Sequence, residues 1–327
     1  MIFELIVKQA IRWFLLFIPV ITAAQTDNVG SGRALQLDGI DDYVIVNGNY
    51  SSINLPFSVS AWVRLDPSAN FVTPVFVTND NDPVYRGFWF VVTPSAILCE
   101  FGDGEGGSNP AFRRGKLANV SDIAGRWVNV SAVMRAPFDI SIYLNGVELG
   151  GSSWGGSFLP MRSAYSTDVP KIGYFLSNSV IYRDKSIIDE VRLWSRALTE
   201  EEIRRDMCVR LVGNEPGLIG YWDFNETSGN TVFDKSPNGF HGQLVGNPIR
   251  VFSGAPIGNS SAYLYTTNWS GKVVSMQTGE NKFTVKDLLG PNDGVHLYQV
   301  NVSPSQMDGL DLTYPTQPYF GAFLASQ

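Results

Sequence analysis

The sequence predicts an all-β protein in which a two-sheet antiparallel sandwich of the jelly-roll type is followed by a smaller β-module. Apolar residues make up 44% of the 327-residue chain, which is enough for a substantial core. Short runs of alternating apolar and polar residues recur along the chain, separated by turns rich in glycine, asparagine, aspartate and proline. Strands that follow one another at this spacing build a sandwich or a jelly roll.

The clearest expected strand is PFSVSAWVRL, in which every second residue from Phe57 to Leu65 is apolar. RWVNVSAVM repeats this pattern from Val128 to Met134. DISIYLNGVEL predicts a hairpin, because Asn145-Gly146 suits the positive φ angles of a two-residue turn. Further strands are expected at residues 74–77, 87–92, 96–101, 169–174 and 187–194.

A single helix is expected, in LTEEEIRRDM. Thr199 is a suitable N-cap, and Glu202 three residues later completes a capping box. Leu198 before the cap and Ile203 after it form a hydrophobic staple. One short helix after a run of strands is expected to cover or plug the sandwich rather than to form a layer of it.

The first 24 residues differ in character from the rest of the chain. Lys8 and Arg12 precede an apolar run, Trp13 to Ile21, and small residues follow it up to Ala24. This order predicts a signal peptide over residues 1–24. A membrane anchor is the alternative, but the run is shorter than the roughly 20 apolar residues that a span needs. We therefore expect a secreted protein, extracellular or at the cell surface, without a membrane span in the mature chain.

Two modules are expected in the mature chain. Residues 25–250 hold the strand pattern of the jelly roll, and the pattern changes after SGAPIG. Residues 255–327 contain shorter strand-like runs, which predict a small C-terminal β-module. Its last expected strand ends only a few residues before Gln327, so the module is either naturally short or truncated, and the abrupt end favours truncation.

Charge and cysteine content narrow the choice of partners. The net charge of −7 argues against nucleic acid, because phosphate binding needs a concentrated basic face and the sequence shows none. Cys99 and Cys208 could form one disulfide, which export permits, or stay as two buried thiols. Geometry rather than spacing decides between these alternatives, so both remain open.

Four segments together resemble LamG-like jelly-roll domains of the concanavalin A-like lectin/glucanase superfamily, of the bacterial secreted type. They are, in order, ALQLDGIDDYVIV, FSVSAWVRL, IYLNGVEL and IIDEVRLWSRALTEEEI, and the likeness covers roughly Arg33 to Gly213. The resemblance implies two packed antiparallel sheets, often a bound calcium ion, and mostly non-catalytic binding of glycans or proteins.

The first of these segments places three carboxylates, Asp38, Asp41 and Asp42, within five residues. Like charges this close must be compensated by water, hydrogen-bond donors or a cation. The spacing is not that of an EF-hand loop, but calcium prefers carboxylate and carbonyl oxygens, which strand-connecting turns supply. A solvated turn rich in aspartate is the alternative.

A fourth acid, Asp189, lies in SIIDEVRLW, where alternation would give it the same face as Val191 and Leu193. A carboxylate among core side chains must be hydrogen-bonded or bound to a cation. The resemblance implies that Asp189 lies near the first turn and shares a structural calcium ion with Asp38, Asp41 and Asp42. Hydrogen bonding of Asp189 to the backbone is the alternative.

Ligand contacts are expected from exposed aromatic rings and acidic loops. Trp154 stands among glycines and serines in GGSSWGGS, so it is the best candidate for stacking on a sugar, with Tyr85 and Trp89 behind it. The loop TNDNDPVYR adds Asp80 and Asp82, and GDGEGGSN is a similar acidic loop. The plainer alternative for both loops is that aspartate and asparagine favour turns.

Catalysis is not expected. Laminarinase-type relatives use a strand motif of the form E-x-D-x-x-E with two catalytic carboxylates, and Ile187 occupies the position of its leading glutamate here. The sequence therefore predicts a secreted, non-catalytic module that binds carbohydrate or extracellular protein and carries a structural calcium ion. The alternatives are an adhesion or protein-interaction component of a surface assembly, and a protein associated with glycoside hydrolases.

Overall fold

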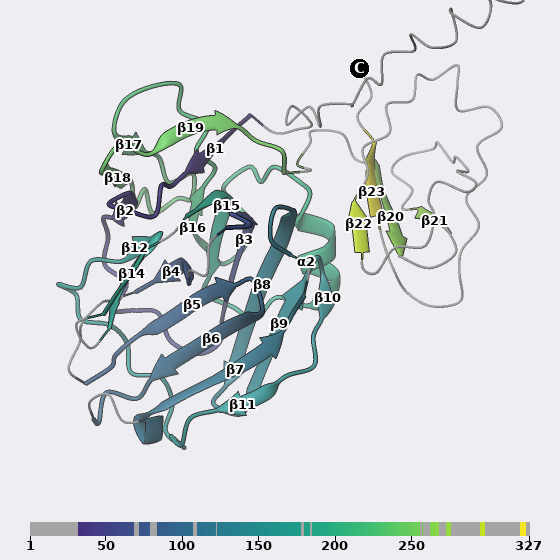
Figure 1. Ribbon diagram of the computed structural model, residues 1–327. Coiled ribbons are helices and arrows are strands. Elements are labelled where there is room, and N and C mark those ends of the chain that lie inside the picture. Colours follow the sequence, from purple (N-terminus) through teal and green to yellow (C-terminus); the bar gives the residue numbers. More distant parts are fainter. Residues whose placement is uncertain are drawn as a thin grey trace, which may run out of the picture.

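The computed structural model describes residues 32–68, 72–78, 84–106, 110–121, 123–177, 180–183, 185–255 and 257, and four short strands beyond them (Figure 1). Two antiparallel sheets pack into a sandwich, so the predicted all-β jelly-roll class is confirmed. Residues 1–24, Asp80 and Asp82 lie outside the described residues. In the part of the chain that is described, no helix has the length and apolar character to span a bilayer.

The first sheet has eight strands. Its order is β10 (Val147–Glu148), β9 (Asp139–Leu144), β8 (Trp127–Ala136), β3 (Phe57–Leu65), β15 (Ser186–Trp194), β1 (Arg33–Gln36) and β19 (Ile249–Phe252), and β16 (Leu218–Trp222) also pairs with β15. The predicted hairpin is confirmed between β9 and β10, where Asn145 and Gly146 have φ angles of 50° and 75°.

The second sheet has nine strands. Its order is β11 (Ser152–Trp154), β7 (Arg113–Asn119), β6 (Ala96–Gly102), β5 (Phe88–Thr93), β4 (Thr73–Val77), β12 (Lys171–Ile172), β2 (Tyr43–Val46), β18 (Gly242–Val245) and β17 (Thr231–Val232). The strand expected at residues 169–174 is divided, because β12 ends before Gly173 and the separate hairpin of β13 (Tyr174–Ser177) and β14 (Val180–Arg183) begins after it. A 3-10 turn, η1 (Pro110–Phe112), precedes β7.

The core lies between the two sheets. The alternating residues of β3 from Phe57 to Leu65 are all part of it, as their spacing predicts. Aromatic rings join the layers: those of Phe57 and Phe88, from opposite sheets, lie 4.3 Å apart between centroids. Cys99 and Cys208 are both buried and free, so the alternative of two thiols is the one observed.

The predicted helix is α2 (Glu200–Asp206), and its capping box is present. The Thr199 hydroxyl accepts from the N–H of Glu202 at 3.1 Å, and the Thr199 N–H donates to the Glu202 carboxylate at 2.9 Å. Leu198 and Ile203 pack in one apolar cluster with Tyr143 of β9. The helix therefore covers the outer face of the eight-stranded sheet, which fits its expected role as a cover.

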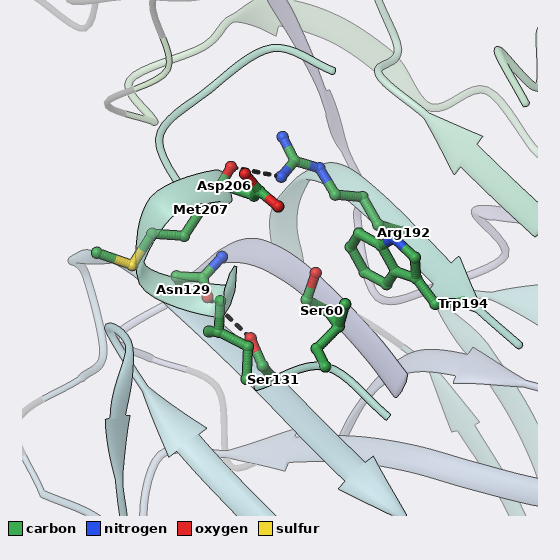
Figure 2. A pocket seen from close by; sticks show the side chains of 9 residues that line it. Ser60, Asn129, Ser131, Arg192, Trp194, Asp206 and Met207 are labelled. Atoms are coloured by element: carbon green, nitrogen blue, oxygen red, sulfur yellow. Dashed lines mark hydrogen bonds between the residues drawn. The ribbon is translucent and has the colours of Figure 1, made fainter. Parts of the chain in front are cut away.

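A water-sized cavity of 10 Å³ remains beneath this helix (Figure 2). Its lining includes Ser60, Asn129 and Ser131 from the sheet and Arg192 at its side. A space of this size holds at most one water molecule.

The expected orientation of Asp189 is wrong. The pairing of β15 with β3 shifts between Asp189 and Arg192, and Glu190 in this bulge has a φ of 53°. Because a bulge adds one residue, it reverses the alternation. Asp189 stands opposite Trp62 on the outer face, whereas Val191 and Leu193 beyond the bulge point into the core.

Four short strands follow the sandwich. They are β20 (Ala262–Thr267), β21 (Val273–Ser275), β22 (Val295–Leu297) and β23 (Gly321–Leu324). All of them belong to one sheet centred on β20. The strands occur where a C-terminal β-module is expected, and the boundaries at residues 250 and 255 stay predictions.

Candidate functional site

The nine-stranded sheet has two ends with different chemistry. Phe88 at the start of β5 pairs with Phe101 near the end of β6, so one end lies beyond Gly102. β2 and β4 run in the same direction with β12 between them, so the start of β2 lies at the opposite end. The acidic turn before β2 and the acidic segment after β6 therefore lie at opposite ends of the sandwich.

An open hollow of 440 Å³ lies at the end beyond Gly102. It is lined by Asn54, Asp103, Glu105, Leu159, Pro160, Met161, Arg162 and Ser163. These residues come from three separate segments: the approach to β3, the segment after β6, and the long connection after β11. Only the acidic segment after β6 was expected from the sequence.

The Asp103 carboxylate is used in hydrogen bonds that hold two segments of the chain together. It accepts a short hydrogen bond from the Ser157 hydroxyl and another from the N–H of Glu105 at 3.0 Å. The Ser157 hydroxyl oxygen accepts in turn from the N–H of Leu159 at 3.1 Å. The long connection is thus fixed against the end of β6, while Glu105 stays exposed at the mouth of the hollow.

The remaining walls of the hollow are also fixed by hydrogen bonds. The backbone of Arg162 donates to Gly102 at 2.9 Å and accepts from Gly87 at 2.7 Å. The Ser163 hydroxyl donates to the side-chain oxygen of Asn54 at 2.8 Å. The hollow therefore presents carboxylate, amide and hydroxyl groups and the exposed Arg162 beside apolar side chains. This combination suits a ligand with many polar groups and some C–H surface.

Trp154 lies on the outer face of the nine-stranded sheet and is half-buried. It stands opposite Gly115 of β7, and Gly115 stands opposite Glu100 of β6. The guanidinium of Arg113 lies over the Trp154 ring at 4.8 Å and forms an ion pair with Glu100 at 3.2 Å. The loop around Trp154 is therefore less open than its glycines and serines suggest, because the ring packs on a charged neighbour.

Tyr85 and Trp89 do not fit the expected role in stacking on a ligand. Tyr85 is only 5% exposed, and its ring lies under Arg113 at 4.6 Å and beside Trp89 at 5.5 Å. Trp89 is 2% exposed and stands opposite Glu100. Both rings are buried beneath other side chains of the outer face, Tyr85 under Arg113. The spacing of residues in the sequence does not show this burial.

Glu100 is the most perturbed acid on this face. Burial raises its pKa to about 7, although the charge of Arg113 and its hydrogen bond favour the ionised form. Among the described residues, its Oε2 and the neighbouring Trp89 Nε1 have no hydrogen-bond partner. The cost of removing the charged carboxylate from water is therefore larger than the stabilisation that it receives from Arg113.

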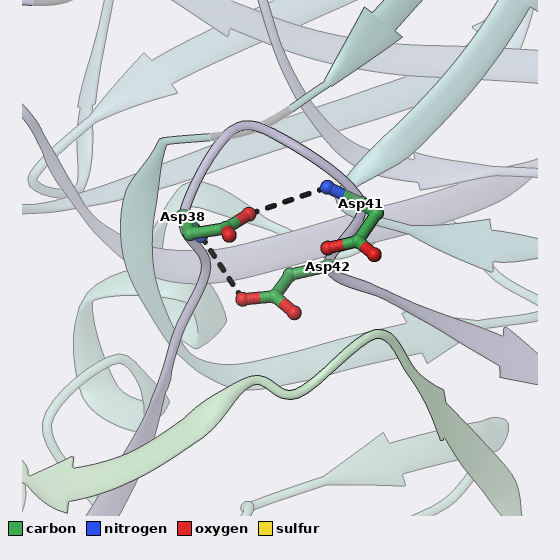
Figure 3. A group of neighbouring side chains, drawn as sticks. All are labelled: Asp38, Asp41 and Asp42. Atoms are coloured by element: carbon green, nitrogen blue, oxygen red, sulfur yellow. Dashed lines mark hydrogen bonds between the residues drawn. The ribbon is translucent and has the colours of Figure 1, made fainter.

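At the opposite end, Asp38, Asp41 and Asp42 lie together (Figure 3), and one carboxylate oxygen from each lies within 4.8 Å of the others. Asp38 Oδ1 accepts from the N–H groups of Ile40 at 2.7 Å and Asp41 at 3.3 Å. Backbone donors thus supply part of the compensation that the three charges require.

Asp42 joins this turn to a distant loop. Its carboxylate accepts from the N–H of Asn247 at 2.7 Å and from the N–H of Asp38 at 3.2 Å. Burial raises the pKa of Asp42, whereas the hydrogen bond from Asn247 opposes the rise. Within the described part of the chain, the second oxygen of Asp38 and the carboxylate of Asp41 keep their lone pairs available, and this donor set fits a calcium ion.

Asp189 does not join this acidic group in the described structure. Its carboxylate accepts from the Ser253 hydroxyl at 2.5 Å and from the N–H of Glu190 at 2.8 Å. Burial, and then the charge of Glu190, raise its pKa well above the usual range. The alternative of a hydrogen-bonded Asp189 is therefore the arrangement observed.

Sequence reasoning missed two exposed aromatic side chains, Phe138 and Phe158. Phe138 lies in the turn between β8 and β9, and Phe158 lies in the connection that follows Trp154. Phe158 stands in the same glycine- and serine-rich stretch that drew attention to Trp154, so the signal was available.

Comparison with known proteins agrees with this architecture. A protein of Bacteroides ovatus ATCC 8483, provisionally assigned as carbohydrate-binding, is similar with a TM-score of 0.51 and 17% identity, over 70% of this chain and 62% of its own length. The heptameric SAP-like pentraxin of Limulus polyphemus is similar with a TM-score of 0.43 and 13% identity, over 68% of this chain and 95% of its own. At such identities, the first likeness shows the fold alone. The chain thus spans less than two thirds of the Bacteroides protein.

No curated protein matches the sequence significantly. A family model does: Laminin_G_3, described as the concanavalin A-like lectin/glucanases superfamily, matches residues 38–204. The match covers half of the chain and includes the strands from β2 to β15 and the first part of helix α2. This protein therefore belongs to the concanavalin A-like lectin/glucanase superfamily.

Proposed function

We propose that this protein is a non-catalytic carbohydrate-binding module and that the hollow beyond Gly102 is its binding site. The observation that carries the proposal is the exposed Glu105 carboxylate beside the Asn54 amide and apolar Leu159, on walls fixed by hydrogen bonds. Rigid walls with a few convergent polar groups are typical of small-ligand sites. The carbohydrate-binding assignment of the similar Bacteroides ovatus protein supports the same ligand class.

A non-catalytic role is supported by the acids of β15. Asp189 and Glu190 occupy the segment where a glucanase-type motif would lie, and both are 1% exposed. Glu190 accepts hydrogen bonds from Arg192 and Tyr221 beneath the layer that covers the eight-stranded sheet. Neither carboxylate can reach a substrate in this position.

Glu105→Gln is expected to weaken glycan binding about tenfold, because a hydrogen bond from a sugar hydroxyl to a carboxylate is stronger than one to an amide. The measurement is retention on a panel of neutral and acidic polysaccharides, followed by titration calorimetry on the class retained. Glu201→Gln is the matched control, since Glu201 is also exposed but lies on α2. Equal affinity of the two variants would exclude the hollow.

Absence of retention on every glycan would shift the proposal to an extracellular protein as partner, in an adhesive surface assembly.

In either case we propose that the protein is secreted. Export of the full chain from a secretory host should yield a mature protein that begins at Gln25, as its intact mass would report. A product that retains residues 1–24 would contradict this part of the proposal.

We further propose that calcium binds at the turn of Asp38, Asp41 and Asp42 and stabilises it. Calcium at 100 times its Kd should add about 2.7 kcal/mol to the free energy of unfolding, seen as a higher Tm. Asp41→Asn should abolish this response, because it removes a carboxylate that the described hydrogen bonds do not use.

The Asp189→Asn variant tests whether Asp189 shares the calcium ion with the turn. It should keep the calcium response, because Asp189 is held by Ser253 and the Glu190 N–H. Loss of the response in Asp189→Asn would restore the shared site that the family resemblance implies. An unchanged Tm of the parent protein in calcium and in chelator would exclude a calcium site at the turn.

A further inference from the structure

We propose that Phe158 and Phe138 form a stacking platform for a second sugar unit, so that the ligand is an oligosaccharide running from the hollow over the rim. This inference rests on the proposed carbohydrate-binding function and extends it to the ligand's length and chemistry. The sugars that fit are neutral pyranoses with equatorial substituents, whose axial C–H bonds form a flat apolar face.

The two rings are unusually exposed for aromatic side chains. Phe158 is 78% exposed and Phe138 is 59% exposed, and their ring centroids lie 5.5 Å apart. They come from different parts of the sandwich, the β8–β9 turn and the connection after β11. Two large apolar side chains brought together at the surface from separate elements indicate a contact site.

Arg114 holds both rings in place. Its guanidinium lies over the Phe138 ring at 4.3 Å and near the Phe158 ring at 5.6 Å, and Arg114 itself is buried. The Arg114 Nε–H donates to the Ser157 carbonyl at 2.9 Å. Cation–π contacts from a buried, anchored cation fix the rings before binding, so less ordering entropy is lost when a ligand arrives.

The platform is continuous with the hollow. Ser157, which accepts from Arg114, also hydrogen bonds to Asp103 in the hollow wall. Leu159 follows Phe158 directly, lines the hollow and is 48% exposed. A glycan unit in the hollow would therefore place its neighbour over Leu159 and Phe158 through a connection that is already rigid.

A sugar suits this surface better than a protein does. A stable protein interface buries about 800 Å² on each partner, far more than three side chains provide. The aromatic rings suit the C–H face of a pyranose, and the adjoining hollow supplies hydrogen bonds for its hydroxyl groups. The Arg114 guanidinium lies over the Phe138 ring, and its Nε–H is already used by the Ser157 carbonyl.

The test measures affinity against chain length. The full chain is titrated with glucose and xylose, and with cello-, laminari- and xylo-oligosaccharides of two to six units. The parent protein should gain at least tenfold in affinity between one and four units of the series it binds. Phe158→Ala should lose most of that gain, while its affinity for the single sugar stays unchanged.

Phe252→Ala is the matched control, because Phe252 is 63% exposed and carries Arg33 over its ring at 5.6 Å on distant β19. Phe138→Ala provides a second variant, and thermal melting verifies that each variant folds. If the affinity of Phe158→Ala and Phe138→Ala still rises with the length of the oligosaccharide as in the parent protein, the platform is overturned.

Three further outcomes separate the proposals. Failure of the parent protein to bind any of these sugars would overturn the platform together with the neutral-glycan site. Monosaccharide binding that is sensitive to Glu105→Gln, without a gain from longer chains, would overturn the platform alone. Loss of binding to an extracellular protein in Phe158→Ala, with glycan affinity intact, would assign the rings to protein docking and overturn it as well.

Discussion

Arg192→Ala is expected to lower the free energy of unfolding by about 3–5 kcal/mol, because it breaks a buried ion pair from one side. The Arg192 guanidinium donates to the Glu190 carboxylate at 2.6 Å. It also donates to the carbonyl of Asp206 at the end of α2 at 2.7 Å (Figure 2). A further hydrogen bond of 2.6 Å goes to the carbonyl of Val209, just beyond the helix. Removal of Arg192 leaves the buried Glu190 carboxylate with the Tyr221 hydroxyl but without its cation. The substitution also removes the hydrogen bond that ties the end of α2 to the sheet.

Urea unfolding at neutral pH measures this loss as a lower midpoint. Arg205→Ala is the control, since Arg205 pairs with Asp206 at the exposed surface of the same helix, and its loss should cost less than about 0.5 kcal/mol. The double variant with Glu190→Gln should be less destabilised than the sum of the two single changes. A loss below about 1 kcal/mol for Arg192→Ala would show that the pair contributes little.

Stability should fall as the pH rises from about 4.5 to 7, because of Glu100. Burial raises its pKa from 4.5 in the unfolded chain to about 7 in the folded protein, so the folded state holds the extra proton within this window. The contribution of Glu100 is fully present below pH 4.5 and lost above about pH 7, and the shift corresponds to about 3 kcal/mol.

Glu100→Gln should remove this contribution, because glutamine has the shape of the protonated acid and no charge. We expect the variant to match the parent at pH 4 and to exceed its stability by about 3 kcal/mol at pH 8, measured by urea unfolding across the range. Glu105→Gln, at an exposed site, should follow the parent profile. Parallel profiles for Glu100→Gln and the parent would refute the assignment to Glu100.

What the sequence predicted well depends on neighbours along the chain. The core face of β3 follows from strict alternation between Phe57 and Leu65, and the cap of α2 follows from residues three positions apart. The positive φ of Asn145 and Gly146 is likewise a local preference. In each case, the residues that determine the conformation lie within one element or turn.

The misplaced residues depend on contacts between distant segments. The bulge at Glu190 arises in the pairing of β15 with β3, and no local pattern shows it. Tyr85 was expected to be exposed, but Arg113, which covers it, belongs to a strand much further along the chain. The hollow needs Asn54, Glu105 and Arg162 from three segments, so only the fold brings it together.

The pairing of β1 with β19 has a mechanical consequence. Arg33 at the start of the sandwich stands directly opposite Phe252 at its end, and the two strands share only four residue pairs. The chain therefore enters the sandwich beside its last strand, and the described residues that follow this strand stay packed as far as Ile257. Neighbouring ends of this kind suit insertion of a module into another chain. A pulling force applied through both flanks would act first on the contacts of Ser253, whose N–H donates to the Gly32 carbonyl at 2.9 Å and whose hydroxyl donates to Asp189 at 2.5 Å. It would then open the four pairs one after another. The core and the hollow would carry load only after this short ladder had opened.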